Sequence, residues 1–133
     1  MRADVLVPSL LRATALIAVV KASLAVAGFE RTLGWIRRRV EREPARDGDP
    51  ARVAAAEYAV AMAAALYPGR ALCLERSLAL YWQLRGRGVA ARFRMGVQMY
   101  PFAAHAWVEH RGEPINDVAE HVMLFRPIEG VGT

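Results

Sequence analysis

The fold is decided within residues 73–97, which read CLERSLALYWQLRGRGVAARFRMGV. In the first half of this stretch apolar side chains recur at helical spacing, whereas from Val89 onward they alternate with other side chains one by one. Spacing of three and four residues is typical of an amphipathic helix, and a period of two is typical of a strand with one covered face. We therefore expect a helix that ends near Gly86 or Gly88 and a strand that runs to Met99.

Helical patterns also fill the chain before this stretch. Apolar residues recur at intervals of three and four between Leu10 and Leu24, after a helix start that we expect at Pro8 and Ser9. Gly28 suits a break better than a helix interior, and helical spacing resumes after it. The first part of the chain is therefore expected to form two consecutive helices.

A third helix is expected after a loop. Residues 41–50 contain prolines, charges and a glycine without apolar periodicity, which is typical of a loop. Asp49 can cap, and Pro50 can occupy, the first turn of an alanine-rich helix over residues 51–67, which Pro68 then stops.

The chain beyond the first strand favours further antiparallel strands. A second strand is expected over residues 103–109, a third over 115–118 and a fourth over 122–126. Helices first and strands second predict an α+β fold rather than alternating parallel units.

The length of 133 residues fits a single domain, 1–133, which can bury a core without a metal or a disulfide. We divide it into a helical N-terminal part, residues 1–67, and a core with a Cys, a His and an Asp, residues 68–133. The chain has one cysteine and so cannot form an intramolecular disulfide. A reducing cytoplasm is therefore the expected location.

The chain carries a net charge of +5, and every basic residue except Lys21 is an arginine. The arginines are spread along the sequence and accompany no helix-turn-helix or zinc-finger spacing, so we expect a solvated face and no nucleic-acid partner. A patch for nucleic acid or for a membrane surface is the alternative. An acidic peptide or protein partner would also match this charge.

The N-terminal apolar run allows two interpretations. Residues 13–20 are apolar and residues 25–27 resemble a small-residue cleavage site, as in a signal peptide. Arg12 and Lys21 bracket a run that is too short to span a bilayer, and helical spacing continues beyond the supposed cleavage site. We expect an amphipathic core helix with no stable membrane insertion.

The single cysteine, Cys73, follows the helix-breaking pair Pro68-Gly69 and opens a helical pattern. The positive field at a helix start favours the thiolate, which is the nucleophilic form of the side chain. His105 and Asp117 can supply a base and the group that orients it. The alternative is an inert core cysteine, because free cysteines are among the most buried residues.

The expected strands bring His105 and Asp117 together. A three-residue loop at 110–112 would pair Glu109 with Glu113 and place His105 opposite Asp117. Directly opposed residues have Cβ atoms about 4.5 to 5.5 Å apart, close enough for a hydrogen bond between imidazole and carboxylate. An imidazole held in this way can take a proton from a thiol and give one to a leaving amine. A structural polar contact at a sheet edge is the other interpretation.

A metal site is a further interpretation, because Cys73, His105, His110, Asp117 and His121 all carry ligand atoms for metals. No Cys-x-x-Cys or His-x-x-x-His pair occurs, so the spacing argues against zinc. We expect no cofactor, and we expect His110 and His121 to lie at the surface.

Two segments resemble the protease domain of the B proteins of lasso-peptide biosynthesis. The first, residues 73–97, has a Cys-Leu-x-Arg-Ser-Leu helix, an Arg-Gly turn and a strand; the second, AHAWVEHRGEPINDV at residues 104–118, has Ala-His-Ala-Trp-Val-Glu and Asn-Asp. Those proteins are similar to transglutaminase-like and papain-like cysteine proteases, so the resemblance implies such a core for the second half of the chain. Residue by residue, it makes Cys73 the nucleophile, His105 the base and Asp117 the orienting acid.

The resemblance also implies a reaction and its partners. The reaction is ATP-independent removal of the leader from a ribosomal precursor peptide, which frees the core's amino terminus for ring closure by a separate ATP-using macrolactam synthetase. Residues 1–72 predict helices and not the strand-rich leader-recognition domain of fused members. The resemblance thus implies a stand-alone leader peptidase that works with a separate leader-binding protein.

The sequence also suggests where substrate is held. Tyr100 and Phe102 precede His105 in a proline turn and are candidates for lining the cleft. Asn116 points away from Asp117 in a regular strand, which makes it the less suitable orienting residue. Two other functions stay open: a transglutaminase-like acyltransferase with the same three residues, and a non-catalytic leader-binding adaptor.

Overall fold

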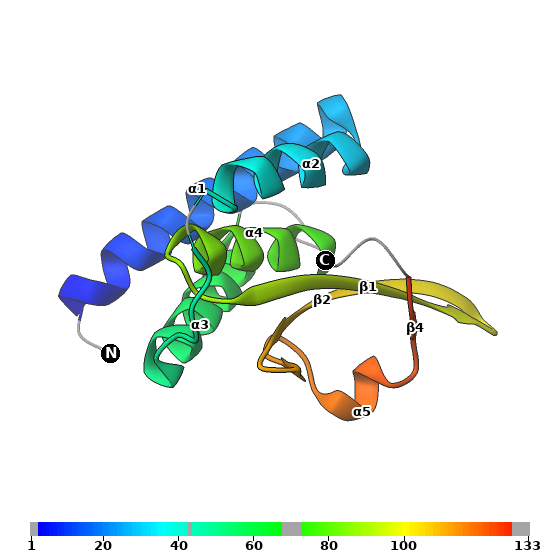
Figure 1. The fold of residues 1–133 in the computed structure, drawn as a ribbon. Coiled ribbons are helices and arrows are strands. Elements are labelled where there is room, and N and C mark those ends of the chain that lie inside the picture. The colour runs from blue at the N-terminus through cyan, green and yellow to red at the C-terminus, as the bar shows by residue number, and fades with distance from the viewer. Residues whose placement is uncertain (1–2, 43, 68–72, 129–133) are drawn as a thin grey trace.

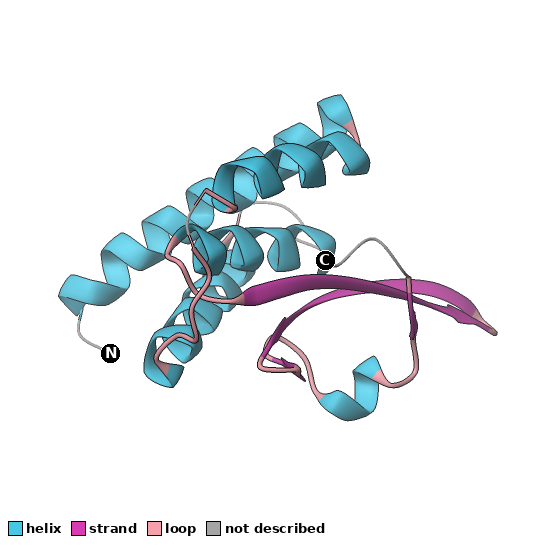
Figure 2. Ribbon diagram, viewed as in Figure 1, coloured by secondary structure: helices cyan, strands magenta, loops and turns pink. Residues whose placement is uncertain are grey.

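The computed structural model describes residues 3–42, 44–67 and 73–128 and shows a layer of helices packed on a small antiparallel sheet (Figure 1). Long helices come first along the chain, and the strands follow with one short helix among them (Figure 2). In chain order the elements are α1 (Ala3–Ala27), α2 (Phe29–Val40), α3 (Pro50–Leu66), α4 (Cys73–Gly86), β1 (Ala91–Met99), β2 (Phe102–His110), β3 (Glu113–Pro114), α5 (Ala119–Val122) and β4 (Arg126–Pro127). The predicted α+β class is confirmed.

A break at Gly28 separates α1 from α2, as predicted. Gly28 has φ 86°, in the left-handed region that glycine enters without steric cost, and its carbonyl accepts a hydrogen bond from Thr32 N at 3.1 Å. The predicted start at Pro8 is wrong, because α1 already begins at Ala3 and contains Pro8. Proline removes one helical N–H bond and its ring crowds the carbonyl four residues earlier, and at Pro8 both effects fall within the first two turns of α1.

One side of α1 packs on α3 and α4 and buries Ala13 and Ile17, while Leu11 and Val26 on the other side are exposed. By length and composition alone, Val7–Ala27 could also cross a bilayer, a test that core helices and N-terminal signal sequences both pass. The helix contacts α3 and α4, and 22% of its apolar window is buried inside the fold.

The start of α3 follows the predicted cap. Asp49 Oδ1 accepts a hydrogen bond from Ala51 N at 3.0 Å, which satisfies one of the free N–H groups of the first turn. The loop before α3 is fastened to the joint between α4 and β1. There Arg46 N donates to Gly88 O, and Ala90 N donates to Arg46 O, each at 2.7 Å.

The strands are ordered β3-β2-β1-β4, and each pair of neighbours is antiparallel. The helices cover one face of the sheet, where Phe93 and Val108 pair across β1 and β2 and are buried in the main core. The segment from α5 to β4 lies against the opposite face (Figure 1). Because side chains alternate along a strand, Ala106 and Val108 face the helices, whereas His105 and Trp107 face the α5 segment.

The loop that joins β2 to β3 is tighter than predicted. It has two residues, Arg111 and Gly112, both at positive φ, and His110 pairs with Glu113. The predicted pairing of Glu109 with Glu113 is therefore wrong by one residue. Two-residue loops with positive φ at both positions favour asparagine, aspartate or glycine, so the arginine gave no signal for one.

The predicted strand over residues 115–118 does not form. After Ile115 N donates to Val108 O at 2.9 Å, the pairing ends because Val108 N bonds to the side-chain Oδ1 of Asn116 at 2.9 Å instead of to a backbone carbonyl. Residues 115–117 bend, and β3 is left with only Glu113–Pro114. The side chain of Asn116 thus competes with the strand ladder.

The predicted strand over residues 122–126 is replaced by the end of α5, a turn and β4. Only Arg126 and Pro127 pair with β1. Met123 and Leu124, which lie within the predicted strand, are exposed. Residues 122–125 are all apolar and lack the alternation of apolar and polar side chains that is typical of a strand with one covered face.

Candidate active site

A hydrogen bond joins His105 Nε2 on β2 to Asp117 Oδ2, which follows the bend after β3. Both side chains are mostly buried, with 14% and 17% of their surface exposed. The sequence predicted this pair, but through a register that the structure does not have. The bend at residues 115–117, and not continued pairing of two strands, carries Asp117 to His105.

Asn116 makes this bend by fastening it to α4. Its Oδ1 accepts from Val108 N, and its Nδ2 donates to Ser77 Oγ, both at 2.9 Å. Ser77 Oγ in turn donates to the backbone carbonyl of Ala106 at 3.1 Å. Ser77 is fully buried, so this chain of bonds fixes α4 against β2 in a place without water access. Asn116 and Asp117 therefore bind different partners, as expected for consecutive side chains that point in opposite directions.

The environment of Asp117 favours its charged form. Partial burial raises the pKa of the carboxyl group, but hydrogen bonds from His121, from Val118 N and from His105 outweigh this effect, so the pKa lies below its ordinary value. The bond from Val118 N reaches Oδ1 and the bond with His121 Nδ1 reaches Oδ2, each at 2.7 Å. A carboxylate with these partners can orient the imidazole of His105 and stabilise its positive form.

Aromatic rings enclose His105. His121 lies edge-on with its ring centroid at 4.7 Å, and Phe125 lies at 5.1 Å. Trp107 stacks at 5.8 Å and donates its Nε1 proton to Glu109 at 3.0 Å. The sequence placed His121 at the surface, where 44% of its side chain is indeed exposed, and offered it only as a possible metal ligand. Its spacing of four residues from Asp117 was the available signal, because side chains at this spacing can meet where a helix begins.

Cys73 is the first residue of α4 and is partly exposed. The preceding residues Pro68-Gly69, which predicted this helix start, lie outside the described part of the chain. Ser77 comes one turn later, about 6 Å along the helix, and contacts the carbonyl of Ala106 next to His105. The start of α4 and the middle of β2 are thus neighbours.

The structure brings His105 and Asp117 into contact, but within its described residues it records no hydrogen bond between Cys73 and either of them. His105 lies on the α5 side of the sheet and α4 lies on the other side, so the thiol can meet the imidazole only past the edge of β2. Among the described residues no strand pairs with this edge beside His105, although Ser77 of α4 binds the carbonyl of the neighbouring Ala106 there. Since Asp117 occupies Nε2, Nδ1 is the ring nitrogen left for the thiol.

Three of the side chains that could bind a metal come together here. Ligand atoms of His105, Asp117 and His121 all lie within 4.8 Å of one another. Their donor types suit zinc, although the hydrogen bonds of both imidazoles to one carboxylate already explain why they are close. Within the described residues this group contains neither Cys73 nor His110.

Three other predicted positions lie elsewhere. His110 was predicted to lie at the surface, and this prediction is wrong. It is the buried last residue of β2, because the tighter loop brings it into the sheet. Tyr100 and Phe102 stand at the free end of the β1–β2 hairpin with 92% and 71% of their surface exposed. Phe102 is three residues from His105, about 10 Å along an extended strand, so neither ring joins the cluster around His105.

The sequence of this chain matches the family model of the transglutaminase-like superfamily over residues 16–130. The chain belongs to the transglutaminase-like superfamily. The match includes Cys73, His105 and Asp117 and spans both the helical layer and the sheet. Cysteine proteases and acyltransferases are typical of this superfamily. Comparison with curated proteins and with solved structures gave no match.

Proposed function

We propose that this transglutaminase-like protein is a cysteine peptidase that removes the leader from a lasso-peptide precursor, with Cys73 as nucleophile. The observation that carries the proposal is the hydrogen bond of His105 Nε2 to Asp117, beside the helix start that holds the only cysteine of the chain. In this pair Asp117 orients His105, and Nδ1 of His105 faces no hydrogen-bond partner among the described residues. An oriented base of this kind is what a thiol nucleophile requires for acyl transfer.

The proposed reaction has two halves. Cys73 Sγ attacks the carbonyl carbon of the bond between leader and core while His105 Nδ1 takes the thiol proton. His105 then gives that proton to the departing amine of the core, and the leader stays bound to sulfur as a thioester. Water, deprotonated by His105, attacks the thioester and releases the leader as a carboxylate and the thiol in its starting form. The approach of Sγ to Nδ1 past the edge of β2 is expected when substrate binds.

The choice of substrate rests on the sequence. The motif around Cys73 and the motif from residues 104–118 resemble those of lasso-peptide B proteins, and Ser77 and Asn116 of these motifs are the residues that fasten α4 to β2. We propose that a separate leader-binding protein delivers the precursor in the cytoplasm, and that a macrolactam synthetase with its own ATP closes the ring. The peptidase itself is proposed to need no cofactor.

An acyltransferase is the second candidate, because the family match is to transglutaminase-like proteins. It would form the same thioester at Cys73 and transfer the acyl group to an amine in place of water. Oxygen from isotopically labelled water would enter the new carboxylate of the leader in hydrolysis and would be missing from the product of transfer.

The test is mass spectrometry of the precursor after incubation with the protein, with and without the leader-binding protein, in buffer containing EDTA. We expect cleavage into leader and core by the wild type, and none by Cys73→Ala. Because Cys73 is the only cysteine, iodoacetamide should label one site and abolish cleavage. Precursor of unchanged mass with a folded wild-type sample, or cleavage that survives in Cys73→Ala, would refute the peptidase, and the latter result would favour the adaptor.

A further inference from the structure

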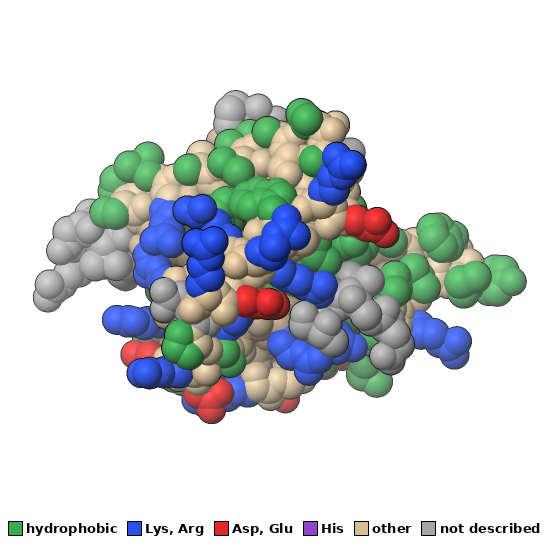
Figure 3. Space-filling model, turned by 45° about the horizontal axis from the view of Figure 1, so that its top comes forward, with side chains coloured by type: hydrophobic (Ala, Val, Ile, Leu, Met, Phe, Trp, Pro, Cys, Tyr) green, Lys and Arg blue, Asp and Glu red, His purple; other side chains and the backbone are tan. Residues whose placement is uncertain are grey.

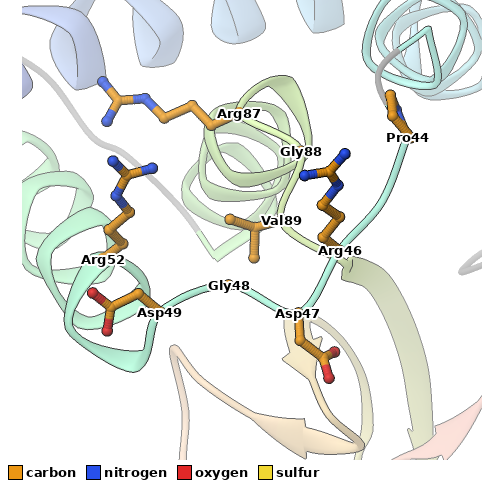
Figure 4. A pocket seen from close by; sticks show the side chains of 9 residues that line it. All are labelled: Pro44, Arg46, Asp47, Gly48, Asp49, Arg52, Arg87, Gly88 and Val89. Atoms are coloured by element: carbon orange, nitrogen blue, oxygen red, sulfur yellow. The ribbon is translucent and has the colours of Figure 1, made fainter.

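A hollow of about 610 Å³ lies where the loop before α3 meets the end of α4 (Figure 4). Arg52 and Arg87 extend toward one another on one side of it, and Arg46 stands on the other side (Figure 4). Val89, which is buried, lies between them. We call this place the arginine hollow. It lies at the far end of α4 from Cys73, about 20 Å along the helix axis, and so is separate from the candidate active site.

The two acidic residues that line the hollow each have a partner other than its arginines. Asp49 caps α3 through Ala51 N, and Asp47 is paired with Arg111 at 3.8 Å on the outside of the loop. Among the described residues, no ion pair involves Arg46, Arg52 or Arg87. In the part of the chain that the structure describes, three guanidinium groups therefore share one hollow without an ion-paired carboxylate.

The positive charges in and near the hollow repel one another. Partial burial lowers the pKa of Arg87, and the positive charges of Arg12 and Arg52 lower it further. Figure 3 shows that basic side chains gather over the helical face of the molecule with few acidic ones among them. An anion placed between these arginines would relieve their repulsion and gain charge-assisted hydrogen bonds.

A second feature suggests what kind of anion fits. A smaller hollow of about 290 Å³ adjoins the first and shares Arg52, Arg87 and Val89 with it. It is also lined by Gln83, whose side chain is 1% exposed and whose Oε1 has no hydrogen-bond partner among the residues that the structure describes. An unpaired acceptor beside cations suits a ligand that carries N–H groups next to its carboxylates, which a peptide does and an inorganic anion does not.

We propose that the arginine hollow binds an acidic segment of a peptide or protein, through carboxylate groups on Arg46, Arg52 and Arg87 and a backbone N–H near Gln83. Guanidinium groups bind carboxylates with two parallel hydrogen bonds, which gives both affinity and orientation. This site is independent of the proposed peptidase activity, because it lies at the other end of α4 and needs no reaction at Cys73.

The experiment measures binding of a fluorescein-labelled hexaglutamate peptide to the full chain by fluorescence anisotropy. The variants are Arg52→Gln, Arg87→Gln and the double variant, and the matched control is Arg31→Gln, an exposed arginine on α2 away from the hollow. A labelled hexaglutamine peptide tests the need for charge, and inorganic phosphate serves as a competitor. All four variants are expected to fold, because Arg31, Arg52 and Arg87 lie at the surface and the burial of Arg87 is only partial.

We expect hexaglutamate to bind, hexaglutamine not to bind, and each hollow variant to weaken binding about ten-fold or more, since hydrogen bonds to charged groups are the stronger kind. The Arg31→Gln variant should bind as the wild type does. Equal losses in Arg31→Gln and in the double variant would overturn the proposal, because they would show attraction by net charge alone. Binding of phosphate without binding of hexaglutamate would overturn it in favour of a small-anion site.

Discussion

Asp117 is shared by two imidazoles through one oxygen. His105 Nε2 and His121 Nδ1 both contact Oδ2, while Oδ1 is held by Val118 N. Because His121 is more exposed than His105, it forms the outer wall of the cluster and keeps water from the carboxylate on that side. The pair of His105 and Asp117 is thereby held in a partly dry environment, where a charge–charge contact is stronger than in water.

Replacing each of the three candidate catalytic residues should give a graded loss of activity. We expect Cys73→Ala and His105→Ala to lower kcat/KM on the order of 10⁴-fold or more, and Asp117→Ala to lower it less, because an orienting carboxylate contributes less than the nucleophile or the base. Precursor cleavage followed by mass spectrometry gives the rates, and circular dichroism checks folding. An Asp117→Ala rate below that of Cys73→Ala would contradict the assigned roles.

The charge of Asp117 should stabilise the fold in a manner that depends on pH. Its pKa is lower in the folded protein than its ordinary value, so the stabilisation is complete above about pH 4 and is lost as the pH falls through the folded-state pKa. We therefore expect Asp117→Asn to be less stable than wild type at pH 7, with a gap that narrows toward pH 3. Urea unfolding at a series of pH values measures this gap.

The matched control for this experiment is Glu113→Gln, which removes an exposed carboxylate from β3. It is expected to unfold at the same urea concentrations as the wild type at pH 7. A gap for Asp117→Asn that is constant or that widens toward pH 3 would be incompatible with a stabilising hydrogen-bonded carboxylate.

Sequence patterns located the helices well because the signals are local. The cap at Asp49, the break at Gly28 and the helix that begins at Cys73 each depend on neighbours within a few residues. The short strands β3 and β4 could not be predicted, because two residues carry no periodicity. Likewise, the side chain of Asn116 ends the β2–β3 pairing through a contact with Val108 that no spacing reveals.

The candidate site was predicted in part for the same reason. His105 and Asp117 were named from residue types and do meet, but the register that was expected to join them is wrong. Ser77 and Asn116 stood inside the quoted motifs without a role, because their bond joins residues 39 positions apart. The pairing of β2 and β3 is set by such long-range contacts and by the turn, and a one-residue slip turns every side chain to the other face.

The joint between α4 and β2 depends on Ser77. Its hydroxyl group donates to Ala106 O and accepts from Asn116 Nδ2, so Ser77→Ala leaves both groups unpaired in the core. We expect a loss of about 1–3 kcal/mol in the free energy of unfolding, together with slower cleavage, because Cys73 and His105 lie on the two elements that Ser77 joins. Urea unfolding and precursor cleavage measure the two effects.

Thr14→Ala is the control for Ser77→Ala, since Thr14 Oγ1 makes a hydrogen bond only within its own helix, to Leu10 O at 2.8 Å. It should change the unfolding free energy by less than about 1 kcal/mol and leave cleavage intact, because such a bond is local. Equal effects of the two substitutions on stability and cleavage would show that the hydrogen bonds of Ser77 between α4 and β2 contribute no more than a bond within one helix.

The sheet as a whole lies between two unequal covers, the helical layer on one face and the thin segment from α5 to β4 on the other (Figure 1). Cys73 belongs to the first cover, and Asp117 directly precedes the second. Apolar side chains are also exposed within this segment, at Met123 and Leu124, and at the hairpin residue Met99. The site therefore depends on the C-terminal segment staying close to the sheet.

Gly96 allows this close approach. It pairs with His105 across β1 and β2, and a Cβ at this position would meet Arg126 O and Phe125 Cβ at 2.9 Å and the Trp107 ring at 3.0 Å. Gly96→Ala must push the C-terminal segment off the sheet, so we expect it to lower the free energy of unfolding by about 1–3 kcal/mol and to reduce cleavage.

In contrast, Gly34→Ala in α2, where the Cβ meets only Arg38 at an ordinary 3.5 Å, should stabilise by about 0.5–1 kcal/mol. Urea unfolding compares the two, and a Gly96→Ala protein as stable and active as wild type would show that the segment from α5 to β4 does not hold the site together.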